Sequence, residues 1–216
     1  MNIAIEIVII VLGVIVGCIY EEYDKFKEKA LIKKDNKKNI GYFVVSMVFM
    51  IGLAIWLQYK YQNTLIHNIR MIALLLCMIP IALIDYKKHI IPNKSLLAVL
   101  VIRLVIYIGE FFVDRKNALS ELKSYGLGVM LIFFFAIVGI FIIKNGFGMG
   151  DLKLMFVMVL YLGFSSVFAS IFTSLIFTLI VAVILMLKKK KGRKDTLPFA
   201  PCLLMGTYIS VLLTGM

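Results

Sequence analysis

Eight stretches of apolar sequence divide this 216-residue chain and limit what it can fold into. They cover residues 3–20, 40–59, 68–84, 95–113, 126–143, 152–163, 165–187 and 197–214. All but one are 17–23 residues long, enough for an α-helix to cross the hydrocarbon core of a bilayer. A soluble domain of this length does not need 62% hydrophobic residues. The sequence therefore predicts an all-α, polytopic membrane helix bundle with about seven or eight transmembrane segments, forming a single domain over residues 1–216.

The sixth stretch, residues 152–163, is the exception. Twelve residues rise only about 18 Å as a helix, so this stretch cannot cross the membrane by itself. It follows a segment with glycines at positions 146, 148 and 150, which permit non-helical dihedrals and the close approach of another chain. Irregular backbone at membrane depth is tolerated only where protein or a watery cavity surrounds it. We therefore expect a short or broken helix here, beside a cavity.

The basic residues indicate how the chain is oriented. Of the 24 Lys and Arg residues, 18 lie in loops on one side of the predicted bundle and 5 on the other. Loops rich in Lys and Arg face the cytoplasm. The sequence thus predicts a multi-pass protein of the cytoplasmic (plasma) membrane, with the lipid bilayer as a partner. The net charge of +12 belongs to these loops, so we expect no nucleic-acid partner.

Cysteine and histidine give no sign of a metal centre. Cys18, Cys77 and Cys202 all lie inside apolar stretches, and none belongs to a CxxC pair. The two histidines, His67 and His89, fall in different parts of the chain. We expect buried thiols, no metal and no cofactor.

Two aspartates stand at the edges of apolar stretches. Asp85 ends the third stretch and Asp151 precedes the sixth, and the predicted topology puts both near the cytoplasmic face. A carboxylate at the edge of hydrocarbon is costly and marks a candidate functional site. Two carboxylates held close together share one proton, because both cannot ionise cheaply. One can then activate a water as general base while the other donates a proton to a carbonyl, which predicts peptide hydrolysis without a metal or a covalent intermediate.

Each of these features, taken singly, also has a structural explanation. Gly146 and Gly150 have the four-residue spacing of glycines that pack membrane helices together. Asp85 precedes Lys87 and Lys88, as in an ordinary solvated helix end. Packing alone does not account for Asp151, so the wider pattern of residues decides between the explanations.

Other polar residues have structural roles in this interpretation. Arg103 and Glu110 lie seven residues apart, hence on one helical face, and we expect them to pair with each other or with neighbours. Lys153 is expected to be an interfacial lysine that faces away from Asp151. Pro198 and Pro201 are expected to loosen the start of the last helix and free backbone groups for an extended substrate.

Four segments of the chain resemble the type IV prepilin peptidases, which are aspartic proteases of the GxGD membrane class. Ile84-Asp85 is followed by Pro92-Asn93, and the family has an aspartate with a proline seven positions later. Residues 147–154, FGMGDLKL, are close to the family pattern F-G-M-G-D-x-K-L. Residues 161–163 end in the family's Leu-Gly turn, and residues 197–201 are similar to its P-F-G-P.

This resemblance implies a leader peptidase for prepilins or pseudopilins. Such an enzyme removes a short basic leader at the cytoplasmic membrane face, just before the substrate's hydrophobic helix. Asp85 and Asp151 match the two catalytic aspartates. The residues that would shape the active site are Gly148, Gly150, Pro92, Pro198 and Pro201.

The chain departs from the family pattern in two places. Many relatives also N-methylate the new N-terminus and carry paired CxxC motifs in a cytoplasmic loop. The first loop here, residues 21–39, contains no cysteine, so we expect no N-methyltransferase activity. Ala200 replaces the usual glycine of P-F-G-P. The compact form is more like the small peptidases of Flp/Tad-type pili or the archaeal preflagellin peptidases.

Two other functions fit parts of the pattern. One is a GxGD intramembrane protease that acts on other membrane peptides. The other is a proton-coupled transporter or membrane-assembly factor, since broken helices and buried carboxylates also suit transporters. Transporters often show repeated halves, which this sequence lacks. The substrate pilin, the organelle it would build and the oligomeric state are not specified by the sequence.

Overall fold

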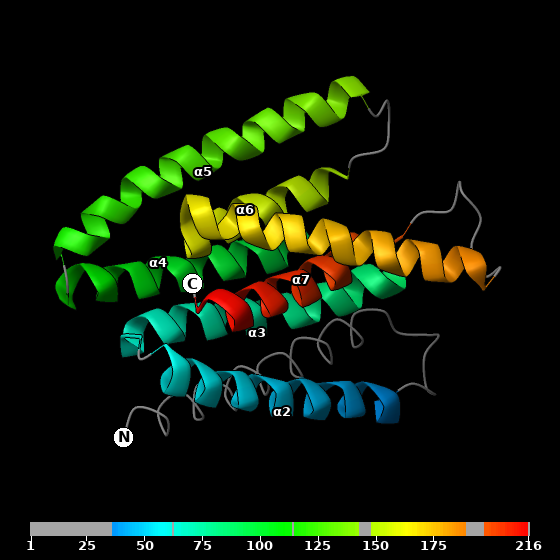
Figure 1. The fold of residues 1–216 in the computed structure, drawn as a ribbon, viewed down its shortest axis with the longest axis horizontal. Helices are drawn as coiled ribbons and strands as arrows, with labels where there is room; N and C mark the ends of the chain where they lie inside the picture. Colours follow the sequence, from blue (N-terminus) through cyan, green and yellow to red (C-terminus); the bar gives the residue numbers. More distant parts are fainter. Residues whose placement is uncertain (1–35, 62, 114, 143–147, 189–196, 216) are drawn as a thin grey trace. The chain divides into compact units, whose positions relative to one another are not determined.

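The computed structural model describes residues 36–61, 63–113, 115–142, 148–188 and 197–215, and these residues form six α-helices and no strand (Figure 1). The helices are α2 (Asn36–Lys60), α3 (Leu65–Lys88), α4 (Asn93–Val113), α5 (Arg115–Ile142), α6 (Met149–Leu187) and α7 (Phe199–Thr214). The expected all-helical fold is confirmed. The first predicted segment, residues 3–20, lies outside the described residues.

The chain divides into two compact units. The first ends at Pro80 and includes Gly215, and the second runs from Ile81 to Thr214. Helix α3 passes from one unit to the other, and Pro80 lies inside it at the boundary. All the described residues that the sequence proposes for the active site belong to the second unit.

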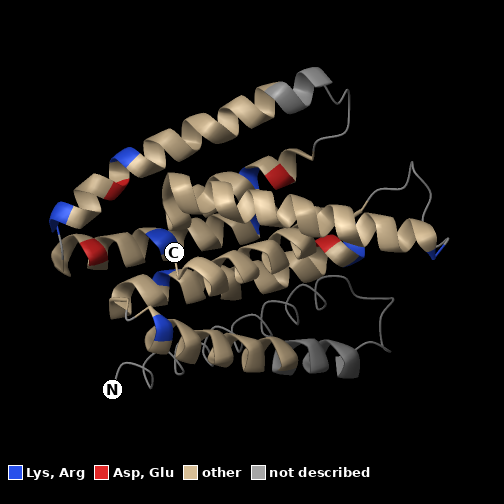
Figure 2. Cartoon of the chain, in the orientation of Figure 1, with Lys and Arg blue, Asp and Glu red and all other residues tan. Residues whose placement is uncertain are grey.

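Four of the described helices are long and apolar enough to cross a membrane: α3, α4, residues 115–137 of α5, and α6. The apolar parts of α2 and α7, Val45–Lys60 and Phe199–Thr214, are shorter. Figure 2 shows these helices uncharged over most of their length. The protein is thus a helical membrane protein, while the count of seven or eight spans stays a prediction.

Helix α6 is broken at Gly163. This residue has φ 76° and ψ −177°, a conformation open almost only to glycine, so the 39-residue element consists of two helices. In Figure 1 the chain turns back here, and the two halves of α6 run in nearly opposite directions in this view. The half from Met149 to the break has 14 residues, about 21 Å, and is too short to span a bilayer. The predicted short segment therefore ends at the residue that the sequence indicates.

Small residues let the helices of the second unit approach closely around α6. At Gly128 in α5, an added Cβ would lie 2.7 Å from Val159 of α6. At Gly206 in α7, an added Cβ would overlap the side chain and backbone of Ser174 in α6. Such approaches by small residues are typical of membrane helix packing, where tight van der Waals contact replaces the hydrophobic effect.

Candidate active site

Asp85 lies in the last turn of α3 and is 5% exposed. The turn closes with a hydrogen bond from the His89 N–H to the Asp85 carbonyl, at 2.8 Å. His89 follows the helix with φ 52°, the left-handed conformation that commonly terminates helices. The turn directs the chain away from α3 while the Asp85 side chain stays buried in the protein.

A backbone amide from α7 holds the Asp85 carboxylate. The N–H of Ala200 donates to Oδ2 of Asp85 at 2.9 Å, in a buried hydrogen bond between residues 115 positions apart. Ala200 is the second residue of α7, where N–H groups have no acceptor within the helix. The helix N-terminus therefore supplies both a donor and a favourable dipole to the carboxylate. Sequence reasoning missed this contact.

The two prolines beside Ala200 do not loosen α7 as expected. Pro198 precedes the helix, and Pro201 occupies its third position. Proline is tolerated in the first turn, because its missing N–H would have had no helical partner. The Ala200 N–H already donates to Asp85 and so is not free for a substrate strand. The expectation that backbone groups of this segment pair with an extended substrate stays a prediction for the groups other than the Ala200 N–H.

Asp151 lies at the N-terminal end of its helix, whereas Asp85 lies at the C-terminal end of α3. Gly148 precedes α6, and the Asp151 N–H donates to the Gly148 carbonyl at 3.0 Å, which places Asp151 in the first turn. The helix dipole favours a negative charge at this position. The residue is partly exposed, and its carboxylate interacts electrostatically with that of Asp85. The two carboxylates, 66 positions apart in the sequence, are therefore within electrostatic range of one another.

The motif glycines are needed for space rather than for unusual dihedrals. Gly148 has extended dihedrals, φ −69° and ψ 123°, and Gly150 is helical. A Cβ on Gly148 would lie 2.7 Å from Oδ2 of Asp151, and one on Gly150 would lie 3.0 Å from Cβ of Ile91. The expected non-helical backbone is therefore present at Gly148, in an extended conformation that any residue can adopt, and absent at Gly150, while the expected close approach is present at both. Gly146 and Phe147 lie outside the described residues.

The connection between α3 and α4 forms part of the same site. Pro92 accepts the first hydrogen bond of α4, from the Leu96 N–H at 3.3 Å, so it fixes where α4 begins. Ile91 just before it is buried and meets Gly150 of α6. Pro92 therefore lies next to the residue that meets the start of α6. Lys153 is exposed and donates from Nζ to Oδ1 of Asn93 at 3.0 Å, a second link between α4 and the start of α6.

An open, apolar groove of about 390 Å³ begins at this link. It is lined by α4, α5 and α6, among others by Leu97, Leu100, Phe133 and Phe156, with Asn93 and Lys153 at its polar end. Leu152, the residue after Asp151, also lines it. Apolar surface is therefore available next to one of the two carboxylates.

Within the described part of the chain, no three His, Cys, Asp or Glu side chains gather as metal ligands would. The polar groups that the structure shows at the site are the two carboxylates and the backbone amide of Ala200. Such groups can bind and orient a water molecule, and can accept or donate protons.

The Ala200 amide can be tested separately from its side chain. Ala200→Pro removes the N–H from which Asp85 accepts a hydrogen bond. Ala200→Val enlarges the side chain to a similar extent but keeps this N–H. We expect Ala200→Pro to lower activity by about tenfold or more, in line with the loss of a hydrogen bond to a charged group, and Ala200→Val to lower it much less. Cleavage per inserted protein is the measurement. Equal losses in the two variants would show that crowding, not the hydrogen bond, matters.

The fold and the site together define a class of protein. It is a polytopic helical membrane protein with two carboxylates near one another at helix ends. Over residues 72–184, just over half of the chain, the sequence matches the type IV leader peptidase family. The chain belongs to this family, which confirms the resemblance, and it is therefore a membrane protease of the leader-peptidase type. No match to a curated protein or to a solved structure was significant.

The matched region contains most of the residues proposed for the site. Asp85, Pro92, Gly148, Gly150 and Asp151 fall within it, and Pro198 and Pro201 lie after it. Family membership also favours a protease over the transporter or assembly-factor alternatives.

Proposed function

We propose that this protein is a prepilin or pseudopilin leader peptidase that uses Asp85 and Asp151 as its catalytic pair. The match to the leader peptidase family over residues 72–184, which contains both aspartates, is the observation that supports the proposal most strongly. The substrate is a membrane peptide with a short basic leader followed by a hydrophobic helix. Cleavage takes place at the cytoplasmic face of the plasma membrane.

The pair would work as a unit. One carboxylate takes a proton from a water molecule, whose oxygen attacks the carbonyl carbon of the scissile peptide bond, while the other gives its proton to the carbonyl oxygen. Collapse of the tetrahedral intermediate then breaks the C–N bond, and the leaving nitrogen receives a proton from the pair. The Ala200 amide holds one carboxylate in position throughout, since backbone donors need little reorganisation.

The apolar segment of the substrate explains why this chemistry is done from inside a membrane protein. A hydrophobic helix that starts just after the scissile bond keeps that bond near the membrane surface. Asp85 sits at the end of α3, which is long and apolar enough to span the bilayer, and Asp151 sits at the start of the short half-helix of α6. A catalytic pair at helix ends can reach a peptide bond at the membrane surface without drawing the leader into the hydrocarbon.

The protein alone should release the leader without methylating the product. The assay would reconstitute it in liposomes with a prepilin that carries a basic leader, a glycine and a hydrophobic helix. Mass spectrometry should find a new, unmethylated N-terminus directly before the hydrophobic helix, in the presence or absence of EDTA. An uncleaved prepilin would contradict the proposed function. Loss of cleavage in EDTA would contradict the metal-free mechanism, and an added methyl group would show that the CxxC loop is dispensable for methylation.

A further inference from the structure

The break in α6 leaves two backbone groups without their helical partners. In an unbroken helix the Leu160 carbonyl would accept a hydrogen bond from the Phe164 N–H. The dihedrals of Gly163 turn that N–H away from the helix axis. A polar backbone group without a partner at this depth would be costly, so each must find another one.

Side chains from two other helices satisfy both groups. Arg103 of α4 donates from Nε to the Leu160 carbonyl at 2.5 Å, and the Phe164 N–H donates to Oγ of Ser124 in α5 at 2.9 Å. Ser124 also fills the space beside Gly163, where an added Cβ would lie 2.7 Å from its Oγ. The break is therefore bracketed from both sides by α4 and α5.

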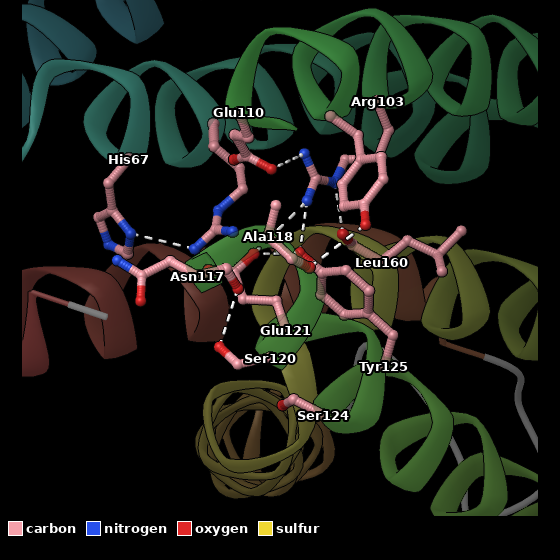
Figure 3. A network of polar contacts seen from close by, with 12 residues as sticks. His67, Arg103, Glu110, Asn117, Ala118, Ser120, Glu121, Ser124, Tyr125 and Leu160 are labelled. Atoms are coloured by element: carbon pink, nitrogen blue, oxygen red, sulfur yellow. Dashed lines mark hydrogen bonds and ion pairs between the residues drawn. The ribbon is translucent and has the colours of Figure 1, made fainter. Parts of the chain in front are cut away.

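The side chain of Arg103 is itself held by several other contacts. Arg103 is 3% exposed, and its Nη1 forms an ion pair with Oε2 of Glu110 at 2.9 Å, as the seven-residue spacing predicts (Figure 3). Nη2 donates to the hydroxyl of Tyr125 at 2.5 Å, and that hydroxyl donates to Glu121. The guanidinium also lies 5.5–5.6 Å from the ring centroids of three tyrosines: Tyr107, Tyr125 and Tyr161. A planar group held in this way has one available position.

The half-helix between Asp151 and the break at Gly163 is packed tightly enough that the position of Arg103 fixes the position of Asp151. Most of its residues are buried, namely Leu154, Met155, Val157, Met158, Val159, Tyr161 and Leu162. The Tyr161 hydroxyl adds a hydrogen bond to the Val99 carbonyl of α4 at 2.9 Å. The ten residues from Asp151 to Leu160, nine helical rises apart from end to end, make a rigid rod of about 14 Å. The fixed end of this rod therefore determines where its other end lies.

We propose that Arg103 and Ser124 are positioning residues that hold α6 broken at Gly163 and thereby fix the half-helix that carries Asp151. The proposal rests on the proposed function for its effect on catalysis, and on geometry alone for its effect on the half-helix. A merely structural role would lower the amount of folded protein and leave the turnover of each folded molecule unchanged.

The catalytic readout separates these roles. Ser124→Ala removes the acceptor of the Phe164 N–H, and Ser124→Thr keeps that acceptor. Ser120→Ala is the matched control one turn earlier in α5, because the Ser120 hydroxyl donates to the Asn117 carbonyl of its own helix. We expect Ser124→Ala to lower kcat about tenfold or more with KM within twofold, and Ser124→Thr to restore it. Arg103→Gln should lower kcat further, toward the ~100-fold that a small misplacement of catalytic groups can cost. Unchanged kcat in both Ser124→Ala and Arg103→Gln would overturn the proposal.

A distance measurement decides the geometry even if the protein cleaves no prepilin. Spin labels at Leu122→Cys in α5 and Lys153→Cys in α6, both exposed positions, would report on the half-helix in lipid nanodiscs, in a background without the native cysteines. The distance distribution should be narrow in the parent and in Ser120→Ala, and shifted or broadened in Ser124→Ala. An unchanged distribution in Ser124→Ala and Arg103→Gln would overturn the proposal whatever the activity. Should Arg103→Gln fail to fold, the Ser124 series alone gives the answer.

Discussion

Asp85→Asn and Asp151→Asn should each leave a co-expressed prepilin at full length while the protein inserts normally. Either asparagine keeps the size of the side chain but cannot take part in the proton exchange of the pair. Residues that act as one catalytic unit are strongly non-additive, so we expect either single change to cost about four orders of magnitude in rate, and the double change little more. The measurement is the fraction of prepilin cleaved at matched levels of membrane-inserted enzyme.

The control removes a carboxylate elsewhere. Asp195→Asn changes an acidic residue in the basic segment before α7, and it should process prepilin at close to the parent rate. Appreciable processing by Asp85→Asn or Asp151→Asn would rule out the two-aspartate mechanism. It would not touch the assignment to the leader peptidase family, which rests on the match over residues 72–184.

Gly148→Ala should slow cleavage about 100-fold, because small displacements of catalytic groups have effects of that size. The new Cβ would lie 2.7 Å from Oδ2 of Asp151, so the carboxylate itself must move. The extended dihedrals of Gly148 suit alanine, so folding and insertion should be little affected. Gly150→Ala meets Cβ of Ile91 at 3.0 Å and should have a smaller effect, through the α3–α4 connection.

Gly126→Ala is the matched control for both glycine changes. A Cβ at this position in α5 would meet nothing within 4 Å. Turnover per inserted enzyme should therefore match the parent in Gly126→Ala and fall in the order Gly150→Ala, then Gly148→Ala. If Gly148→Ala cleaved at the parent rate, Asp151 would have room to move without loss, and the motif glycines would be packing residues only.

Much of the architecture could be predicted from the sequence because apolar length is a strong constraint in a membrane. The 12-residue stretch that ends at Gly163 is too short to span a bilayer, and the structure breaks α6 at that residue. The seven-residue spacing of Arg103 and Glu110 predicted a shared face, and the two side chains form an ion pair. In both cases a geometric rule about helices leads directly to the result.

The contacts that hold the site together could not be predicted in this way. The Ala200 amide has no side-chain signature, and its role appears only when α7 is placed against the end of α3. A glycine in a sequence can serve either an unusual dihedral or a close neighbour. Only the positions of the Asp151 carboxylate and of Ile91 show that Gly148 and Gly150 are needed because a side chain would not fit there. Nothing in the sequence distinguishes Ser124 from other serines, because its hydroxyl accepts the Phe164 N–H only where α6 is broken.

The order in which the ribosome makes these parts has a consequence for biogenesis. Arg103 and Ser124 precede Gly163 in the chain, so the partners of the broken backbone are already made when α6 emerges. Asp85 is different, because the amide that holds its carboxylate belongs to α7, which is synthesised after both α3 and α6. A nascent chain that stops before Ala200 thus carries both acids but lacks the backbone donor that holds Asp85.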